Sequence, residues 1–377
     1  MKKVKLLQIT HDLSIGGLQQ VVLNICKYID RSIFDVSILC LRSTGEYAHD
    51  LEEMGINIAC LDRSGTAKDY FNFLKIRKFL LAGEFNIIHT HNTEPFIDGT
   101  LSALISNVKT LIHTDHARNF PDHKHYMFAE WVMSHFAYRV VGVSEHTAYN
   151  LIRYESINPS KVVVIKNGID CEKYSPKVDS GNLRDSLDID GNFPILGLCV
   201  RLSKQKGIVY LLRALPEVIK IFPKTRLVIV GSGREEKFLK NLSHEIGVDK
   251  NVIFLGARTD IPQLIKLFDI YVLPSLWEGL PMVVLESMAT GCPIIATDVG
   301  GNGSVIQHNI NGSLIPPKKP AAISNEIIRL SSDPSLRRRY MDNGLDTVHK
   351  DYCAQIMTRK YESLYLRKCN DGNCSVL

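Results

Sequence analysis

Residues 273–297 read LPSLWEGLPMVVLESMATGCPIIAT and hold two glutamates, Glu278 and Glu286, with seven residues between them. The apolar run before Pro274 predicts a buried strand, the glycine and prolines that follow break it, and residues 282–289 repeat apolar side chains at helical spacing. One carboxylate therefore falls on a loop and the other in the first turns of a helix. Helix N-termini attract anions and carboxylates suit hydroxyl-rich groups, so this unit predicts a site that holds a phosphate and a sugar together.

The rest of the chain alternates strand-like and helix-like segments, and it does so twice. Strands are expected at residues 4–9, 36–41, 56–61, 87–90, 110–113, 139–143 and 162–165, and again at 194–200, 226–230, 252–255, 270–273 and 293–297. Alternation of this kind gives parallel sheets that are covered by helices on both faces. We therefore expect an α/β fold of two doubly wound, Rossmann-like domains that face each other across a cleft, joined by the polar stretch 174–193.

Ligands of open parallel sheets collect beyond the carboxyl ends of the strands, so motifs at these places carry the most weight. Gly16 and Gly17 follow the first strand and precede a predicted helix over 18–28. Their lack of side chains lets the backbone approach a ligand whose charge the helix N-terminus favours. An ordinary strand-to-helix turn is the alternative. A dinucleotide fingerprint is excluded because the G-x-G-x-x-G spacing is not present.

Arg201 and Lys206 follow the first strand of the second half, in the segment RLSKQKG. Arginine offers a fixed fork for phosphate oxygens and lysine a mobile point charge, and together they can neutralise a diphosphate as it leaves. The alternative is a pair of surface cations at a strand end. Both residues precede a predicted helix that starts near Gly207, which favours the phosphate site.

The stretch from Glu278 to Glu286 resembles the E-x7-E motif of retaining glycosyltransferases of family 4, which have the GT-B fold. The resemblance extends from Gly16-Gly17 through the NGID segment at 167–170 and the Arg201 segment to the final helices. It implies transfer of a sugar from a UDP- or GDP-linked donor to a glycan or lipid-linked acceptor, in cell-surface polysaccharide or glycoconjugate synthesis. It also implies retention of configuration by front-side attack, in which the departing phosphate takes the acceptor proton.

The same resemblance assigns residues to roles. It implies a catalytic set of His116, Arg201, Lys206 and Glu278. It implies a donor-binding set of Gly16, Gly17, Arg201, Lys206, Gly231, Gly233, Glu278, Gly279, Leu280, Pro281 and Glu286. Of the two glutamates, Glu286 resembles the one that accepts from the ribose hydroxyls and Glu278 the one beside the transferred sugar. The acceptor is assigned to His91 and Asn92.

The expected domains are an acceptor-binding domain over 1–177, a nucleotide-sugar domain over 190–352, and a helix over 353–377 that crosses back to the first domain. One departure from the family pattern lies after Gly301. Family members commonly carry a Pro-Glu pair there, whereas this chain reads Asn302-Gly303-Ser304-Val305. The missing carboxylate bears on which sugar is preferred.

No cofactor and no metal are expected, as the family implies. Two H-x-H pairs, His89 with His91 and His123 with His125, leave zinc binding as an alternative, which the lack of a cysteine or carboxylate companion disfavours. Asp188-Ile189-Asp190 spells the D-x-D that metal-dependent glycosyltransferases of another fold use, but it lies in the polar stretch between the two halves. We interpret it as a solvated loop.

Charge and cysteine content bear on the binding partners and the cellular compartment of the protein. A net charge of +5 over 377 residues is too mild to predict nucleic-acid binding, but it allows peripheral contact with an anionic membrane surface. Nine cysteines, scattered among apolar segments, indicate buried reduced thiols. The N-terminal apolar run is too short for a signal peptide. We expect a cytoplasmic protein, at the inner face of the membrane if it binds there.

Two other functions stay open. A nucleotide-sugar epimerase of the same fold would also need carboxylates and histidines, and a non-catalytic nucleotide-sugar-binding protein would keep the donor residues alone. The E-x7-E motif with Arg201 and Lys206 favours a transferase over the first alternative. His116 and the Gly16-Gly17 loop favour it over the second.

Overall fold

The chain folds into two compact units, each built on one parallel sheet. The computed structural model describes residues 3–61, 71–106, 108, 110–116, 121–279 and 282–368. Unit 1 comprises Met1–Gly168 with Ala354–Leu377, and unit 2 is Ile169–Cys353. The N-terminal boundary therefore lies at Gly168, ahead of the expected end at residue 177.

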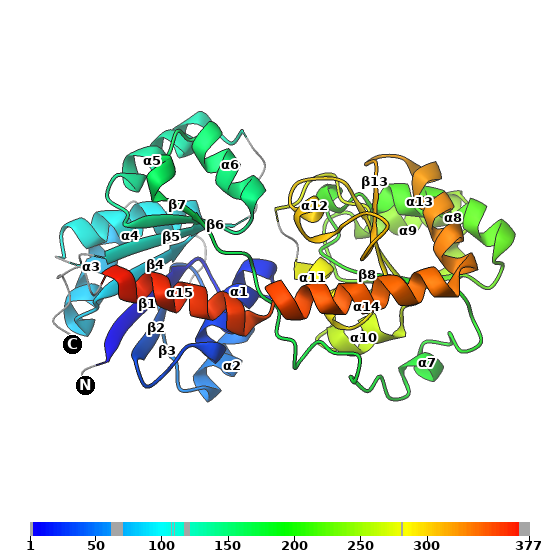
Figure 1. Ribbon diagram of the computed structural model, residues 1–377, viewed down its shortest axis with the longest axis horizontal. Helices are drawn as coiled ribbons and strands as arrows, with labels where there is room; N and C mark the ends of the chain where they lie inside the picture. The colour runs from blue at the N-terminus through cyan, green and yellow to red at the C-terminus, as the bar shows by residue number, and fades with distance from the viewer. Residues whose placement is uncertain are drawn as a thin grey trace. The chain divides into compact units, whose positions relative to one another are not determined.

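Unit 1 holds a seven-stranded sheet in the order β3-β2-β1-β4-β5-β6-β7. Its strands are β1 (Val4–Thr10), β2 (Phe34–Cys40), β3 (Asn57–Cys60), β4 (Ile87–His91), β5 (Thr110–Asp115), β6 (Arg139–Gly142) and β7 (Val162–Val164). Its helices are α1 (Gly17–Tyr28), α2 (Tyr47–Glu53), α3 (Asn72–Gly83), α4 (Thr93–Leu104), α5 (Lys124–Ser134), α6 (Glu145–Arg153), the 3-10 turn η1 (Pro159–Lys161) and α15 (Ala354–Lys368). Helix α1 contacts α2 and α15 in one layer, and α4 contacts α3 and α5 in the other (Figure 1).

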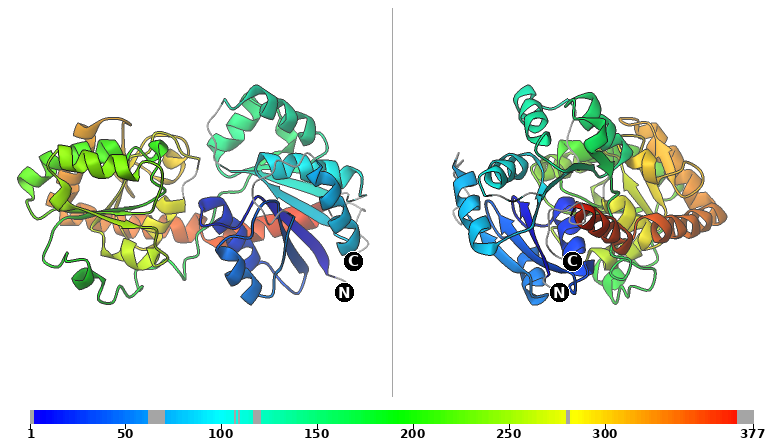
Figure 2. Two further views of the ribbon diagram at one scale, coloured as in Figure 1. Left: turned by 180° about the vertical axis from the view of Figure 1, so that it is seen from behind. Right: turned by 60° about the vertical axis from the view of Figure 1, so that its left-hand side comes forward.

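Unit 2 holds a six-stranded sheet in the order β10-β9-β8-β11-β12-β13. Its strands are β8 (Ile195–Cys199), β9 (Arg226–Val230), β10 (Val252–Gly256), β11 (Ile270–Leu273), β12 (Ile294–Thr297) and β13 (Ser313–Ile315). Its helices are α7 (Leu183–Ser186), η2 (Lys204–Lys206), α8 (Ile208–Ile221), α9 (Glu236–Glu245), η3 (Asp249–Asn251), α10 (Ile261–Leu267), α11 (Met282–Ala289), α12 (Asn302–Val305), α13 (Pro320–Ser332) and α14 (Pro334–Asp351). Helix α8 contacts α9 and α13, and α11 contacts α10 and α14 in the opposite layer (Figure 2).

The strand pattern predicted from the sequence is confirmed in both units. All twelve expected strands are present within two residues at each end, because mostly apolar segments such as 4–9 and the continuous apolar run 270–273 are buried in the sheets. The short strand β13 was not predicted. Both sheets share one order, which reverses between β1 and β4 in unit 1 and between β8 and β11 in unit 2.

The polar stretch that we expected to be a linker belongs to unit 2. Within this segment Ile189 is fully buried and Tyr174 is 4% exposed, and Ile169, a few residues before it, is fully buried as well. These three apolar anchors hold the stretch against the unit, while its polar residues stay at the surface. Composition alone points to a linker here because the anchors are few and far apart.

The cysteines correct one expectation. Cys171 and Cys353, which are 182 residues apart in the sequence, form a disulfide with their Cα atoms 6.0 Å apart. A backbone bridge between Ile169 and Cys353 brings the two segments together. The expectation of reduced thiols was wrong for this pair. It holds for Cys26, Cys40, Cys199 and Cys292, which are buried and form no disulfide, and burial raises the pKa of the Cys26 and Cys292 thiols to about 12.

Candidate active site

The centre of the site in unit 2 is a contact that spans the reversal point of the sheet. Lys206 lies in η2 after β8, and Glu278 lies on the loop after β11. The Nζ of Lys206 donates to Oε1 of Glu278 over 2.5 Å, and Oγ of Ser275 donates to the same oxygen over 2.6 Å. Only 4% of the Glu278 side chain and 14% of the Lys206 side chain are exposed. The pair is therefore a mostly buried, hydrogen-bonded ion pair.

Backbone and side-chain bonds hold the Glu278 loop in place. The amide of Leu276 donates to the carbonyl of Gln205 over 2.7 Å, which joins the loop directly to η2. Oγ1 of Thr297, at the end of β12, donates to the carbonyl of Ser275 over 2.6 Å. The Glu278 carboxylate is thus fixed before any ligand arrives.

Two glycines let the neighbouring turn approach the segment that carries Arg201. Gly231 and Gly233 follow β9 with φ values of 123° and 158°, and a Cβ on either would collide with the carbonyl oxygen of Val200 or Leu202. These glycines are therefore needed for backbone packing, whatever they contact in a ligand. The Arg201 side chain is exposed at the end of β8, so its guanidinium is open to a ligand.

Glu286 lies in the second turn of α11 and is 8% exposed. Burial raises the pKa of its carboxyl to about 7, although a hydrogen bond from Tyr174 and the charge of Lys173 act in the opposite direction. Sequence reasoning missed both partners because Tyr174 falls in the stretch that looked like a linker and Lys173 directly precedes it. The sequence feature that could have identified them is the lysine and tyrosine pair just after the NGID segment.

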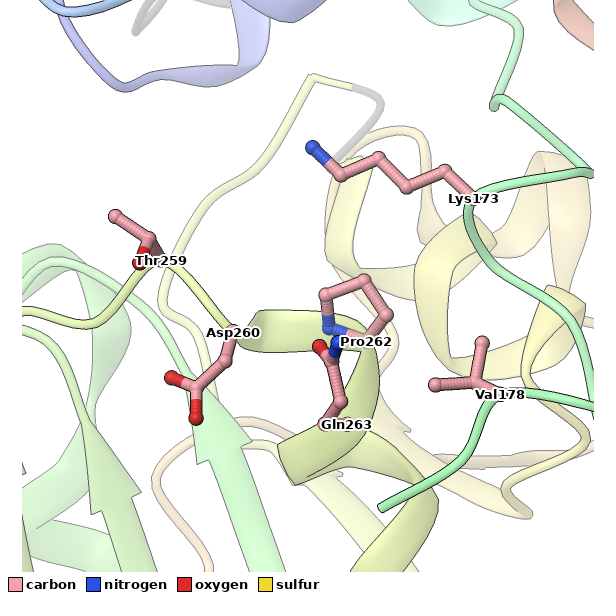
Figure 3. A pocket seen from close by; sticks show the side chains of 6 residues that line it. All are labelled: Lys173, Val178, Thr259, Asp260, Pro262 and Gln263. Atoms are coloured by element: carbon pink, nitrogen blue, oxygen red, sulfur yellow. The ribbon is translucent and has the colours of Figure 1, made fainter. Parts of the chain in front are cut away.

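A pocket of about 350 Å³ opens beside this region of unit 2. Figure 3 shows Lys173 and Val178 on one side of it and the turn from β10 into α10 on the other, where Thr259, Asp260, Pro262 and Gln263 lie. Asp260 forms an ion pair with Arg258 over 2.6 Å, and this hydrogen-bonded partner lowers the pKa of the Asp260 carboxyl. The pocket is therefore lined by the cationic side chain of Lys173, by the polar side chains of Thr259, Asp260 and Gln263, and by the apolar Val178 and Pro262.

The other donor residues predicted in unit 2 are only partly described. Gly279 is buried next to Glu278. Leu280 and Pro281 lie outside the described residues. Arg201, Lys206, Gly231, Gly233, Glu278 and Gly279 all follow the carboxyl ends of strands of one sheet, as the sequence predicts.

The predicted residues of unit 1 also gather at a carboxyl edge. Gly16 lies between β1 and α1 and Gly17 begins α1, His91 ends β4 and Asn92 follows it, and His116 follows β5. These three strands are adjacent in the sheet. Nδ1 of His91 lies 3.1 Å from Nε2 of His116, and Oδ1 of Asn92 accepts from the His116 amide over 3.4 Å.

The two histidines differ in depth. His116 is 7% exposed, whereas His91 is fully buried and its second ring nitrogen contacts Oε1 of Gln8 over 2.7 Å. Burial lowers the pKa of His116 to about 3 and that of His91 well below its usual value, so both rings are neutral at pH 7. The expected contact between the His91 side chain and an acceptor does not fit this geometry, because both ring nitrogens face other side chains.

The structure also shows the surroundings of the residues that were considered as metal ligands. Both ring nitrogens of His89 face hydroxyls, those of Tyr365 and Thr114, each at 2.8 Å. Among the described residues, the one group of three side chains close enough to share a metal is Cys171, His349 and Cys353, in which the two sulfurs are joined as a disulfide. Asp188 and Asp190 precede β8 and so lie toward the amino edge of the sheet, away from Glu278.

Two family models match this chain in succession. The model described as "Glycosyltransferase Family 4" matches residues 15–173, and the one described as "Glycosyl transferases group 1" matches residues 179–347. The chain belongs to glycosyltransferase family 4. It is an enzyme of that family with the GT-B fold, and the Lys206–Glu278 pair lies at the glutamate motif by which the sequence resembled it.

Individual relatives agree with this assignment. The chain is 28% identical, over 92% of its length and 95% of the relative's, to the UDP-Gal:alpha-D-GlcNAc-diphosphoundecaprenol alpha-1,3-galactosyltransferase of Escherichia coli. A glycosyltransferase from Rickettsia africae has the same fold, with a TM-score of 0.84 and 21% identity over 97% of this chain and 99% of that one. Anabaena HepE in complex with UDP also matches with a TM-score of 0.84, at 22% identity, over 97% of this chain and 100% of that chain.

Removal of the Lys206 amine should destabilise the protein through Glu278. The Lys206→Met variant leaves a carboxylate buried without its cation, which costs roughly 3 kcal/mol and lowers the melting temperature by roughly 5–10 °C. Differential scanning calorimetry measures this. Lys204→Met, on the same turn but exposed, is the control and should melt like the wild type. The double variant Lys206→Met/Glu278→Gln should recover part of the loss, and equal melting of Lys206→Met and wild type would contradict the buried ion pair.

Proposed function

We propose that unit 2 binds a nucleoside-diphosphate sugar and that the enzyme transfers the sugar with retention of configuration. The observation that carries this proposal is the fixed Lys206–Glu278 pair at the reversal point of the sheet, with the exposed Arg201 guanidinium at the end of the adjoining strand. Arg201 supplies a positive charge for the diphosphate, and Glu278 supplies a carboxylate for sugar hydroxyls. The leaving diphosphate is where charge develops during transfer, so this is where an electrostatic site accelerates the reaction.

The nucleoside occupies the pocket between Lys173 and Thr259, in this proposal. Glu286 accepts hydrogen bonds from the ribose hydroxyls, which its ionised form does best. A volume of about 350 Å³ lies in the range of small-molecule sites. The donor is a UDP-sugar, with a GDP-sugar as the alternative, because the E. coli relative is named for UDP-Gal and HepE was solved with UDP.

Retention without a metal ion is the finer part of the proposal. The Glu278 carboxylate already accepts from Lys206 and Ser275, which leaves it a poor nucleophile and favours attack on the face of the departing phosphate. Arg201 and Lys206 supply the positive charge that a metal ion supplies in other transferases. Asp188 and Asp190 lie before β8, away from the carboxyl edge, which supports a role outside the chemistry.

The acceptor is a glycan or, as we favour, a lipid-diphosphate-linked sugar. This preference comes from the E. coli relative, whose acceptor is named as a diphosphoundecaprenol-linked GlcNAc. In unit 1, Asn92 and His116 lie at the carboxyl edge and offer polar groups to such an acceptor. Among the described residues, no helix combines the length and apolar character that a membrane crossing requires.

A transfer assay tests the function. The purified protein is incubated with UDP-Gal, UDP-GlcNAc or GDP-mannose and an undecaprenyl-diphosphate-linked sugar, in EDTA. We expect a glycosylated lipid whose new bond has the anomeric configuration of the donor, as NMR of the product reports. Inverted configuration, or a strict need for added Mn²⁺ or Mg²⁺, would contradict the mechanism. Isomerisation of the donor without acceptor would indicate an epimerase, and nucleotide binding without turnover would indicate a binding protein.

Donor binding should depend on pH through Glu286. Its carboxyl, with a pKa of about 7, is ionised above that pH and protonated below it, so the acceptor for the ribose is lost as pH falls. UDP affinity, measured by calorimetry, should therefore be about tenfold weaker at pH 6 than at pH 8. Glu286→Gln should remove this difference. Tyr174→Phe should move the midpoint upward, because it removes a hydrogen bond that lowers the pKa. A midpoint near 4.5 would contradict the assignment.

Peripheral membrane contact has its own candidate surface on α5. Lys124, Phe128 and Trp131 of α5 and His135, just after its end, are exposed at helical spacing along one face, with Phe128 64% exposed and its ring centroid 5.7 Å from that of Trp131. Exposed aromatic rings next to a cationic side chain suit the boundary between lipid headgroups and acyl chains. We propose that this α5 stripe binds the inner membrane face, where a lipid-linked acceptor is presented.

Vesicle sedimentation tests the α5 stripe. The wild type should bind vesicles that contain anionic phospholipid. The double variant Phe128→Ser/Trp131→Ser should bind at least about tenfold more weakly, because it lacks the two rings that would be buried in the lipid. Phe238→Ser removes an aromatic ring that is 51% exposed on α9 of unit 2 and is the matched control. Equal binding by the double variant and the control would rule out the stripe.

A further inference from the structure

Three buried polar side chains of unit 1 form a chain of polar contacts that ends at His116. Gln8 lies on β1, His91 on β4, and His116 just after β5, so the contacts run across three adjacent strands. Oε1 of Gln8 lies 2.7 Å from Nε2 of His91, and Nδ1 of His91 lies 3.1 Å from Nε2 of His116. Gln8 and His91 are both fully buried. His89 packs on His91, with ring centroids 4.2 Å apart.

The direction of these hydrogen bonds follows from what each atom can do. The Oε1 of a glutamine side chain only accepts, so Nε2 of His91 must carry a proton. A neutral imidazole carries one proton, so Nδ1 of His91 is an acceptor and Nε2 of His116 must donate to it. The proton of His116 is thereby committed to Nε2. Its Nδ1 keeps a lone pair.

Burial keeps both rings in this neutral state. It lowers the pKa of His116 to about 3 and lowers that of His91 well below its usual value. The amide of Gln8 and the neutral rings of His89 and His116 lie against His91. His89 is itself held by the hydroxyls of Tyr365 and Thr114, which restricts rotation of the His91 ring packed against it.

We propose that Gln8 and His91 are positioning residues that fix His116 as the tautomer protonated on Nε2 and leave Nδ1 as a hydrogen-bond acceptor for a substrate hydroxyl. The claim that Nδ1 of His116 accepts from a substrate hydroxyl rests on the proposed transferase function. The claim that Gln8 and His91 fix the tautomer of His116 does not. An Nδ1 acceptor favours a sugar with a free hydroxyl at the matching position. It disfavours a sugar that presents a carbonyl or carboxylate oxygen there, because two acceptors meet.

The tautomer is measured directly by NMR. Long-range ¹H–¹⁵N correlation of ¹⁵N-histidine-labelled protein separates the two neutral tautomers, and the His116 signals are assigned by their loss in His116→Asn. We expect Nε2-protonated His116 in the wild type. Gln8→Met removes the acceptor for His91 and should leave His116 as a mixture. Thr90→Val, which removes a buried hydroxyl on the same strand that contacts His113, should leave the His116 signals unchanged. A wild-type His116 protonated on Nδ1 would overturn the proposal.

Turnover tests the role of His91 separately. His91→Leu fills the space but offers no acceptor to His116, so kcat should fall by about tenfold or more with little change in KM for the donor. In His91→Asn the amide oxygen takes the place of Nδ1, and kcat should return to within about threefold of the wild type. Equal losses in the two variants would overturn the positioning role. Absence of transfer by the wild type would instead count against the proposed function, while the NMR result would still decide the tautomer.

Discussion

The reversal of strand order, between β1 and β4 in one sheet and between β8 and β11 in the other, is the constraint on which the candidate sites depend. Helices that follow the two strands at such a point leave toward opposite faces, as α1 and α4 do in unit 1 and α8 and α11 do in unit 2. The carboxyl edge between them is therefore left open for polar side chains. Gly16 and His91 flank this point in the first sheet, and Lys206 and Glu278 flank it in the second.

The sequence was sufficient for features that depend on local pattern. Short, mostly apolar segments predicted the strands of both sheets except β13, and the break after Leu273 followed by helical spacing predicted α11 with its correct bounds. Since the carboxyl ends of parallel strands share one edge, the approximate place of Arg201, Lys206 and Glu278 followed as well. Strand β13 was missed because Ser313–Ile315 is short and begins with a polar residue, whereas the equally short β7 consists of three valines.

Features that depend on distant partners were not predictable in this way. The stretch after the NGID segment looks like a linker until Tyr174 is seen against Glu286. His91 looks like an exposed group at a strand end until Gln8 and His116 are seen on its two nitrogens. Its neighbour His89 bonds to Tyr365, a residue 276 positions away. Alternation along a strand indicates which side chains share a face, but the depth of that face is set by whichever later helix covers it, here α15.

The Cys171–Cys353 disulfide changes what unit 1 has to accomplish when it folds. Unit 1 is interrupted in the sequence by unit 2, and Gly168 must come near Ala354 before α15 can pack against α1 in unit 1. In a chain without crosslinks, that requires closure of a very long loop, with an entropic cost that grows with the logarithm of its length. The disulfide closes a span of 182 residues covalently and leaves only a few residues on either side. Once the disulfide has formed, Gly168 and Ala354 are joined by a short covalent path that bypasses unit 2. Helix α15 can then dock on unit 1 whether or not the sheet of unit 2 has formed.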